Sequence, residues 1–121
     1  MKIIIETRNI QITEVLEDFI EEKMAKLERF LKDIEKRDSE KGKDLSEIRV
    51  IVGRNSKHHK KGAIFSAECN LFFPPKTINA IEDADNMSSA IIKVRDEILR
   101  QIKNRKKKMI DLRRKPRKYK I

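Results

Sequence analysis

The spacing of apolar positions along the chain predicts four strands and two helices. Runs of β-branched and alternating apolar residues predict the strands, and apolar residues three and four positions apart predict the helices. The expected strands are residues 2–8, 48–52, 63–73 and 77–81, and the expected helices are residues 14–34 and from 83–85 to about 109–114. The element order is therefore β-α-β-β-β-α.

Local signals support these boundaries. Thr13 is suited to cap the first helix, with Glu14 and Glu17 near its positive end. The acidic residues around the expected start of the second helix can serve the same purpose there; they are Glu82, Asp83 and Asp85. Pro116 lacks a backbone N–H, so we expect the second helix to end before it.

The element order predicts an α+β fold with a four-stranded mixed sheet. A right-handed crossover makes the first two strands parallel, and the short connections that follow make the rest an antiparallel meander. The two helices then lie parallel to each other on one face of the sheet, with their C-terminal ends together. The basic segment 54–61 would lie at the opposite end. We expect one domain over residues 1–110, followed by a flexible basic tail, 111–121.

The positive charge is concentrated in the last quarter of the chain. The 121 residues carry 30 Lys and Arg against 20 Asp and Glu, a formal charge of +10. Residues 93–121 hold 14 basic and 3 acidic residues (+11), whereas residues 1–92 hold 16 and 17 (−1). A near-neutral domain with one cationic end indicates a polyanionic partner, above all nucleic acid.

The second helix and the tail supply most of the candidate RNA-binding residues. More basic residues lie in the last 22 positions than a helix end needs to complement its own dipole. Such a row can neutralise successive phosphates. The candidates are Arg100, Lys103, Arg105, Lys106, Lys107, Lys108, Arg113 and Arg114.

Two further groups of basic residues are candidates. Lys23 falls near the middle of the first helix's apolar face, where its aliphatic stem could simply cover the core; with Lys26 and Arg29 it could also join a phosphate-binding surface. The segment between the second and third strands holds Lys57, Lys60 and Lys61, which either touch phosphate or form a solvated turn.

Catalysis, metal binding and membrane insertion find little support. The chain has three glycines, no glycine-rich phosphate loop and no nucleophile elbow, so we expect neither an enzyme nor a cofactor. His58, His59 and Cys69 are too few for a structural zinc site, so no metal is expected. No run reaches the roughly 18 apolar residues of a membrane span, and a single cysteine suits a reducing cytoplasm.

Several segments in this order resemble the ribosome hibernation-promoting factor family, which includes ribosome-associated inhibitor A. The resemblance covers residues 1 to about 108. It rests on the segments IIIETRNIQIT (3–13), EKMAKLE (22–28), DNMSSAI (85–91) and LRQIK (99–103), with the lysines that follow.

The resemblance implies a translation inhibitor with the same β-α-β-β-β-α fold. Such a protein binds the small ribosomal subunit in the channel of messenger and transfer RNA and blocks translation under stress. The family's basic positions fall on Lys23, Lys26, Arg29, Arg100 and Lys108. Because the long form's C-terminal dimerisation domain is missing, we expect a short form that is monomeric off the ribosome.

This chain departs from the family pattern at three positions of the second helix. Ser88 replaces a usual Tyr, Ile92 replaces a polar residue, and Glu97 replaces a frequent Lys. The Glu97 replacement implies that one phosphate contact is lost or is supplied by Lys103.

Two other functions remain open at this stage. A general double-stranded RNA-binding protein is the first, because the basic segment before the third strand is similar to a loop of that domain; however, that domain has lysines at the start of its last helix, where this chain has acidic residues. The second is a regulator that docks on an acidic protein without any RNA.

Overall fold

The fold was analysed in a computed structural model. It describes the backbone of residues 2–38, 46–54, 64–73 and 76–118, and side chains over 2–32, 46–54, 64–72 and 76–105. The elements in chain order are β1 (Lys2–Arg8), α1 (Glu14–Asp38), β2 (Glu47–Arg54), β3 (Phe65–Phe73), β4 (Lys76–Ala84) and α2 (Met87–Lys118).

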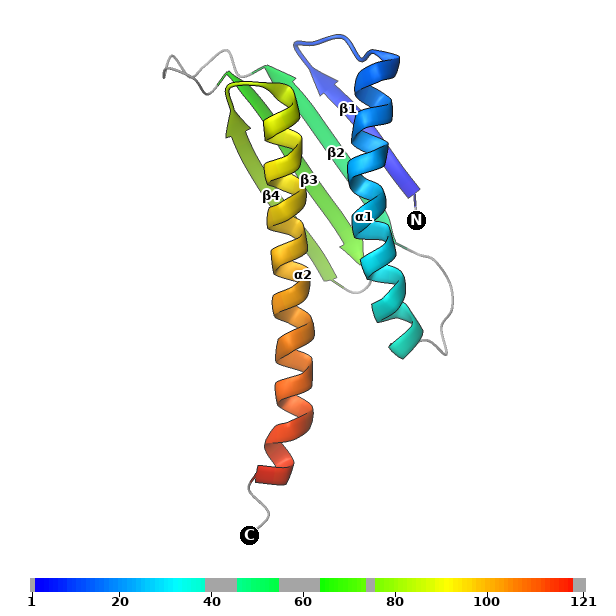
Figure 1. Ribbon diagram of the computed structural model, residues 1–121, viewed down its shortest axis with the longest axis vertical. Coiled ribbons are helices and arrows are strands. Elements are labelled where there is room, and N and C mark those ends of the chain that lie inside the picture. Colours follow the sequence, from blue (N-terminus) through cyan, green and yellow to red (C-terminus); the bar gives the residue numbers. More distant parts are fainter. Residues whose placement is uncertain (1, 39–45, 55–63, 74–75, 119–121) are drawn as a thin grey trace.

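The strands form one mixed sheet in the order β1-β2-β3-β4 (Figure 1). β1 and β2 are parallel, and β2, β3 and β4 are successively antiparallel. The predicted α+β fold and β-α-β-β-β-α order are therefore confirmed. The crossover through α1 joins the two parallel strands, and the short connections join antiparallel ones.

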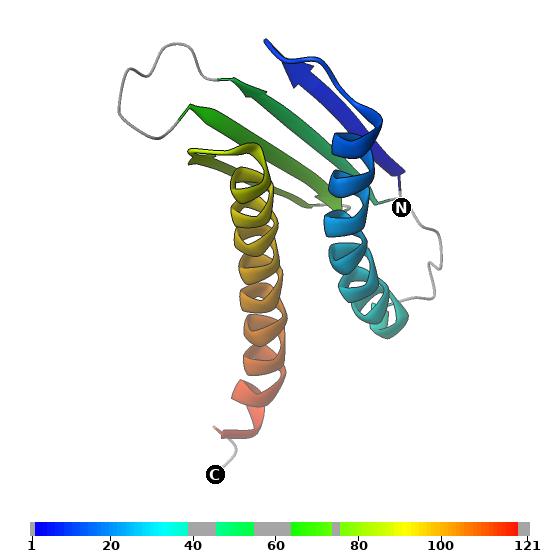
Figure 2. The ribbon, with the colours of Figure 1, turned by 45° about the horizontal axis from the view of Figure 1, so that its top comes forward.

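Both helices lie on the same face of the sheet and run in the same direction (Figures 1 and 2). Alternate residues of the strands point toward them and form the core. On α2 the buried stripe includes Ile91, Val94, Ile98 and Ile102. The other face of the sheet carries no helix in the described part of the chain.

The first helix starts where the sequence indicates. The Leu16 backbone N–H donates to Thr13 Oγ1 at 3.1 Å, which confirms Thr13 as the cap. Asn9, between β1 and α1, has a φ of 59°, a left-handed conformation that asparagine tolerates better than most residues. The helix ends at Asp38, four residues later than predicted.

The helix face toward the core differs from the prediction by one position. Met24, which the sequence pattern did not single out, is fully buried, whereas the side chain of Lys23 is 25% exposed. Lys23 Nζ lies 5.2 Å from the centroid of the Phe19 ring, at the margin of the core. The stem of Lys23 therefore covers apolar surface while its ammonium reaches solvent.

The boundary between β4 and α2 was predicted incorrectly. Glu82 and Asp83 belong to β4, which continues to Ala84, and α2 begins only at Met87. The first turn of α2 holds no acidic residue. Its cap is Asn86, whose Oδ1 accepts from the Ser89 backbone N–H at 2.8 Å.

The end of α2 was also predicted incorrectly. The helix runs past Pro116 to Lys118. A proline here removes one backbone hydrogen bond two residues before the helix ends, which costs less than a break in its middle. The helix is continuous across the predicted domain boundary at 110, and a division there stays a prediction. Within the described residues, neither helix has an apolar stretch that could cross a membrane.

The length of α2 carries it beyond the sheet. A helix of 32 residues spans about 48 Å, whereas a nine-residue strand spans about 30 Å. Among the described side chains of α2, Ile102 is the last that belongs to the core, and the helix continues past the ends of the strands (Figure 1). The predicted basic segment of α2 therefore lies on this projecting part.

The corrected helix face predicts different effects for two neighbouring substitutions. Met24→Ala removes a fully buried side chain and should lower the free energy of unfolding by about 2–5 kcal/mol. Lys23→Ala should lower it by less than about 1 kcal/mol, because the ammonium is already in solvent. Urea unfolding monitored by circular dichroism measures both. A larger loss for Lys23→Ala would contradict the assignment.

Candidate nucleic-acid interface

The C-terminal halves of α1 and α2 meet at one end of the domain, and a cation marks the contact. Lys103 Nζ of α2 lies 5.9 Å from the centroid of the Phe30 ring of α1. The aromatic face attracts the ammonium and holds it between the helices. Both helices run toward this end of the domain, as predicted, and α2 continues past the end of α1 (Figure 1).

On α1, three predicted basic residues lie along this end. Because Phe30 faces α2, Lys26 and Lys23 lie one and two turns earlier on the same side of the helix. Lys26 is exposed, and Lys23 Nζ lies 3.9 Å from Glu22 Oε1. Arg29 is exposed on the outer surface of α1.

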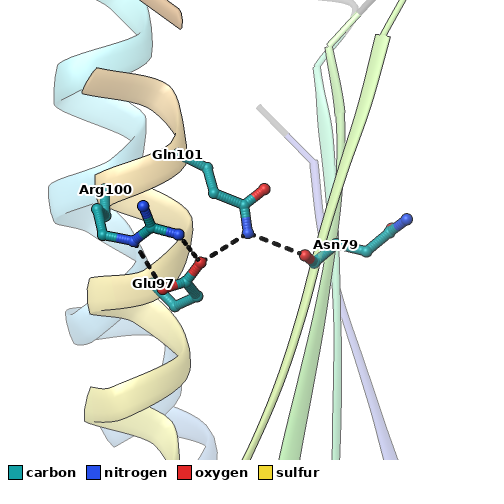
Figure 3. A network of polar contacts seen from close by, with 4 residues as sticks. All are labelled: Asn79, Glu97, Arg100 and Gln101. Carbon is teal, nitrogen blue, oxygen red and sulfur yellow. Dashed lines mark hydrogen bonds and ion pairs between the residues drawn. The ribbon is translucent and has the colours of Figure 1, made fainter. Parts of the chain in front are cut away.

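On α2, Arg100 is held by an acidic neighbour. Arg100 Nε and Nη2 donate to Glu97 Oε1 and Oε2 at 2.9 and 2.7 Å (Figure 3). Gln101 Nε2 donates to Glu97 Oε2 at 2.9 Å and to the backbone oxygen of Asn79 at 3.2 Å. Arg100 is therefore exposed but already neutralised, and a phosphate would have to displace Glu97.

The same contacts shift both pKa values. The hydrogen bond from Arg100, followed by that from Gln101, lowers the pKa of Glu97 from 4.5 to about 2. The hydrogen bond to Glu97 raises the pKa of Arg100 above its ordinary value. Glu97 therefore stays ionised throughout the physiological range, and the Arg100–Glu97 pair contributes almost no net charge.

Arg95 is a basic residue on α2 that the sequence analysis missed. Its side chain is only 15% exposed, and its Nε and Nη2 donate to Asp96 Oδ1 at 3.0 and 2.8 Å. The adjacent acidic residue cancels its charge, so a charge count gives no signal at this position. Arg95 and Arg100 are thus each paired with a carboxylate on the N-terminal half of α2, where Lys93 instead donates to the backbone oxygen of Asp83.

Past Arg100, the two cations of α2 whose side chains the structure describes have no such carboxylates. Lys103 is exposed and Arg105 is half-buried, and neither forms an ion pair with any residue in the described part of the chain. Lys106, Lys107, Lys108, Arg113 and Arg114 lie on the helical backbone of α2, but their side chains are outside the described residues. Lys57, Lys60 and Lys61 are also outside them.

Four cations on the C-terminal halves of the two helices form no ion pair with another described residue: Lys26, Arg29, Lys103 and Arg105. We call these four residues the helix-end cations. They come from two parallel helices, which the contact of Lys103 with Phe30 brings together, and they are candidates for binding a polyanion. Their side chains donate without accepting, which suits phosphate oxygens.

The described residues offer no second chemistry at this surface. No group of three or more potential metal ligands occurs among them. Cys69 is buried in the core, and burial, followed by the charge of Glu68, raises the pKa of its thiol to about 12. This thiol is therefore protonated and inert at neutral pH.

One known protein family matches most of the chain. Residues 3–110 match the family model described as sigma 54 modulation protein / S30EA ribosomal protein. The chain belongs to this family. The S30EA family consists of ribosome-associated regulatory proteins and not of enzymes, so the resemblance found in the sequence is confirmed.

Two solved structures share the fold. The N-terminal domain of Protein Y from Thermus thermophilus is 23% identical, with a TM-score of 0.64, and the alignment covers 86% of this chain and 98% of that one. A ribosomal subunit interface protein from Coxiella burnetii is 20% identical, with a TM-score of 0.64 and coverage of 88% and 98%. No protein with a curated description matches the sequence.

The Glu97 carboxylate predicts a stability difference that depends on pH. Its pKa is lower in the folded state, so its contribution is complete above about pH 4.5 and is lost as the pH falls toward 2. Glu97→Gln should therefore lower the melting temperature at pH 7, and the difference from the wild type should shrink toward pH 2. Differential scanning calorimetry across this range measures it.

A titration of the Glu97 carboxyl group by NMR separates the effects of Arg100 and Gln101 on its pKa. The midpoint of Glu97 should lie near 2 in the wild type. It should rise more in Arg100→Ala than in Gln101→Ala, because Arg100 is the larger cause. A midpoint near 4.5 in the wild type would show that the pair does not form in solution.

Proposed function

We propose that this protein binds the small ribosomal subunit in the channel of messenger and transfer RNA and blocks translation under stress. The observation that carries the proposal is the contact of Lys103 with Phe30, which brings together two helix halves that both carry cations without an ion pair to another described residue. Membership of the S30EA family supports the ribosome as the target. The site of action would then be the cytoplasm, where ribosomes translate.

The mechanism requires occupation and no chemical step. The helix-end cations bind phosphates of ribosomal RNA, and the folded domain excludes other ligands from the same channel. Each phosphate that a cation neutralises releases counterions, so the affinity falls steeply with salt. The projecting part of α2, with Lys106, Lys107, Lys108, Arg113 and Arg114, would extend the contact along the RNA.

General binding of double-stranded RNA is the alternative. Proteins with this function use a double-stranded RNA-binding domain that has lysines at the start of its last helix. In this chain the residues that precede α2 are Asp85 and Asn86, and the cations lie at the other end of the helix. The charge distribution on α2 therefore favours the ribosomal proposal.

A competition experiment tests the proposed location on the ribosome. Purified small subunits should co-sediment with the protein, and bound messenger and transfer RNA should prevent it. Binding that ignores these ligands, or that equals binding to plain duplex RNA of the same length, would contradict occupation of the channel.

Charge reversal tests the proposed surface. The double variant Arg29→Glu with Lys103→Glu should weaken small-subunit binding by roughly tenfold or more. The slope of the logarithm of the binding constant against the logarithm of the salt concentration should become shallower by about two. Both side chains are exposed, so the melting temperature should stay within a few degrees of the wild type. The control is Arg8→Glu with Arg54→Glu, two exposed cations at the opposite end of the sheet, of which Arg54 contacts the Phe65 ring as Lys103 contacts Phe30; this variant should bind nearly as the wild type does. An equal loss in both double variants would indicate only a non-specific charge effect.

A further inference from the structure

We propose that the edge of β1, which pairs with β2 alone among the described strands, binds the β1 strand of a second copy of this chain, with the two strands antiparallel and centred on Ile4. This surface is separate from the helix-end cations. The pairing would join two four-stranded sheets into one of eight strands. It departs from the sequence-based expectation of a monomer off the ribosome.

The backbone pattern shows which groups of β1 are available. The Lys2 N–H donates to the Ser46 oxygen on the β2 side at 3.2 Å. In a parallel ladder, alternate residues direct both backbone groups to the same neighbour, so Lys2, Ile4 and Glu6 bond toward β2. The N–H and C=O groups of Ile3 and Ile5 therefore point outward from the sheet.

The two edges of the sheet differ in whether side chains occupy their backbone oxygens. At the β4 edge, backbone oxygens are already occupied by α2, because Gln101 Nε2 bonds to Asn79 O and Lys93 Nζ bonds to Asp83 O at 3.4 Å. At the β1 edge, three successive isoleucines, 3–5, remain partly exposed. A hydrophobic edge strand with unpaired backbone groups is a template for another strand.

Charge selects both the partner and the register. When Ile4 lies opposite Ile4 of the second copy, Lys2 lies opposite Glu6 on both sides of the axis. A shift that centres the pair on Ile5 would instead place Lys2 opposite Arg8, which is repulsive. The segment Lys2-Ile3-Ile4-Ile5-Glu6 is thus complementary to itself in one antiparallel register.

The backbone pattern agrees with this register. With Ile4 on the axis, Ile3 lies opposite Ile5 of the second copy, and these are the residues whose backbone groups point outward. They form the hydrogen-bonded pairs, and Ile4 forms the non-hydrogen-bonded pair, in which the side chains approach most closely. The hydrogen-bond pattern excludes registers that place an outward residue opposite an inward one, such as Ile4 opposite Ile5, and the charge pattern then favours the Ile4-centred register over the Ile5-centred one.

The charged pairs would form on the face of the sheet that the helices leave open. Ile3 and Ile5 pack against the core, so the alternate residues Lys2, Ile4 and Glu6 face the other way. Within one copy, Lys2 is in register with Glu47, and Glu6 Oε1 lies 3.6 Å from Arg49 Nε with both side chains about half exposed. Each new pair would thus join an existing row of alternating charges.

A five-residue strand pair is a small interface, so the association is weak and needs high protein concentration. The first test therefore uses sedimentation equilibrium of untagged, nucleic-acid-free protein over about a hundredfold range of concentration. The wild type should show a monomer–dimer equilibrium. A strictly monomeric wild type at the highest concentration would overturn the proposal.

A pair of charge variants tests the register. Lys2→Glu alone opposes two glutamates at both pairs, and Glu6→Lys alone opposes two lysines, so each should lose dimerisation. An equimolar mixture should recover it, because the mixed dimer has a lysine opposite a glutamate at both pairs. Both variants keep a net positive charge, so general attraction cannot produce this result. No recovery in the mixture would overturn the proposed register.

Disulfide cross-linking tests whether the twofold axis of the proposed dimer passes through Ile4. Ile4→Cys places two thiols at a non-hydrogen-bonded pair, where Cα atoms about 4.5 Å apart permit a disulfide. The control is Ile81→Cys on β4, which is 62% exposed and lies on the edge that α2 blocks. Under mild oxidation Ile4→Cys should cross-link faster, although its side chain is less exposed. The native Cys69 is buried and should not interfere. Equal rates would mean random collision and would overturn the proposal.

Discussion

The apolar stripe of α2 packs against β3 and β4 from Ile91 to Ile102, and α1 packs beside it on the same face. Each fully buried isoleucine or valine in this layer contributes roughly 1.5–3 kcal/mol of hydrophobic stabilisation. Because one sheet face must accommodate both helices, and because both follow strands that run the same way, the helices are parallel. The position of the cations depends entirely on this arrangement.

Parallel packing has an electrostatic cost that the charge distribution offsets. The C-terminal end of a helix carries a partial negative charge, and here two such ends lie at the same end of the domain. Phosphate groups usually bind at helix N-termini, where the dipole attracts them. In this protein the side chains must first compensate two unfavourable dipoles. The density of Lys and Arg in the last quarter of the chain is consistent with this requirement.

The sheet and its topology followed from the sequence because alternation and the handed crossover leave few other arrangements. The error at the boundary between β4 and α2 arose because the same residues carry both a helix-start signal and a strand signal. Glu82 and Asp83 have the composition of a helix start, yet Ala80, Glu82 and Ala84 continue the alternation of β4 toward the core. Alternation was the better guide, because strand pairing with β3 extends to Ala84.

The interface could be predicted only in part. Helical spacing predicted that the two helices run toward the same end of the domain, but it cannot decide between adjacent positions such as Lys23 and Met24. The neutralisation of Arg100 by Glu97 could have been predicted from the sequence, since residues three apart face each other on a helix. The neutralisation of Arg95 by Asp96 was not, because neighbours in sequence diverge on a helix and only the side-chain geometry shows the contact.

The unequal edges of the sheet limit how far the chain can assemble. A strand that joins β1 leaves only β4 edges at the two outer sides, and there Gln101 and Lys93 already hold the backbone oxygens of Asn79 and Asp83. A twofold pair would therefore close on itself and could not grow into a fibre. The two side-chain bonds from α2 would then stand in the way of amyloid-like extension of the paired sheet.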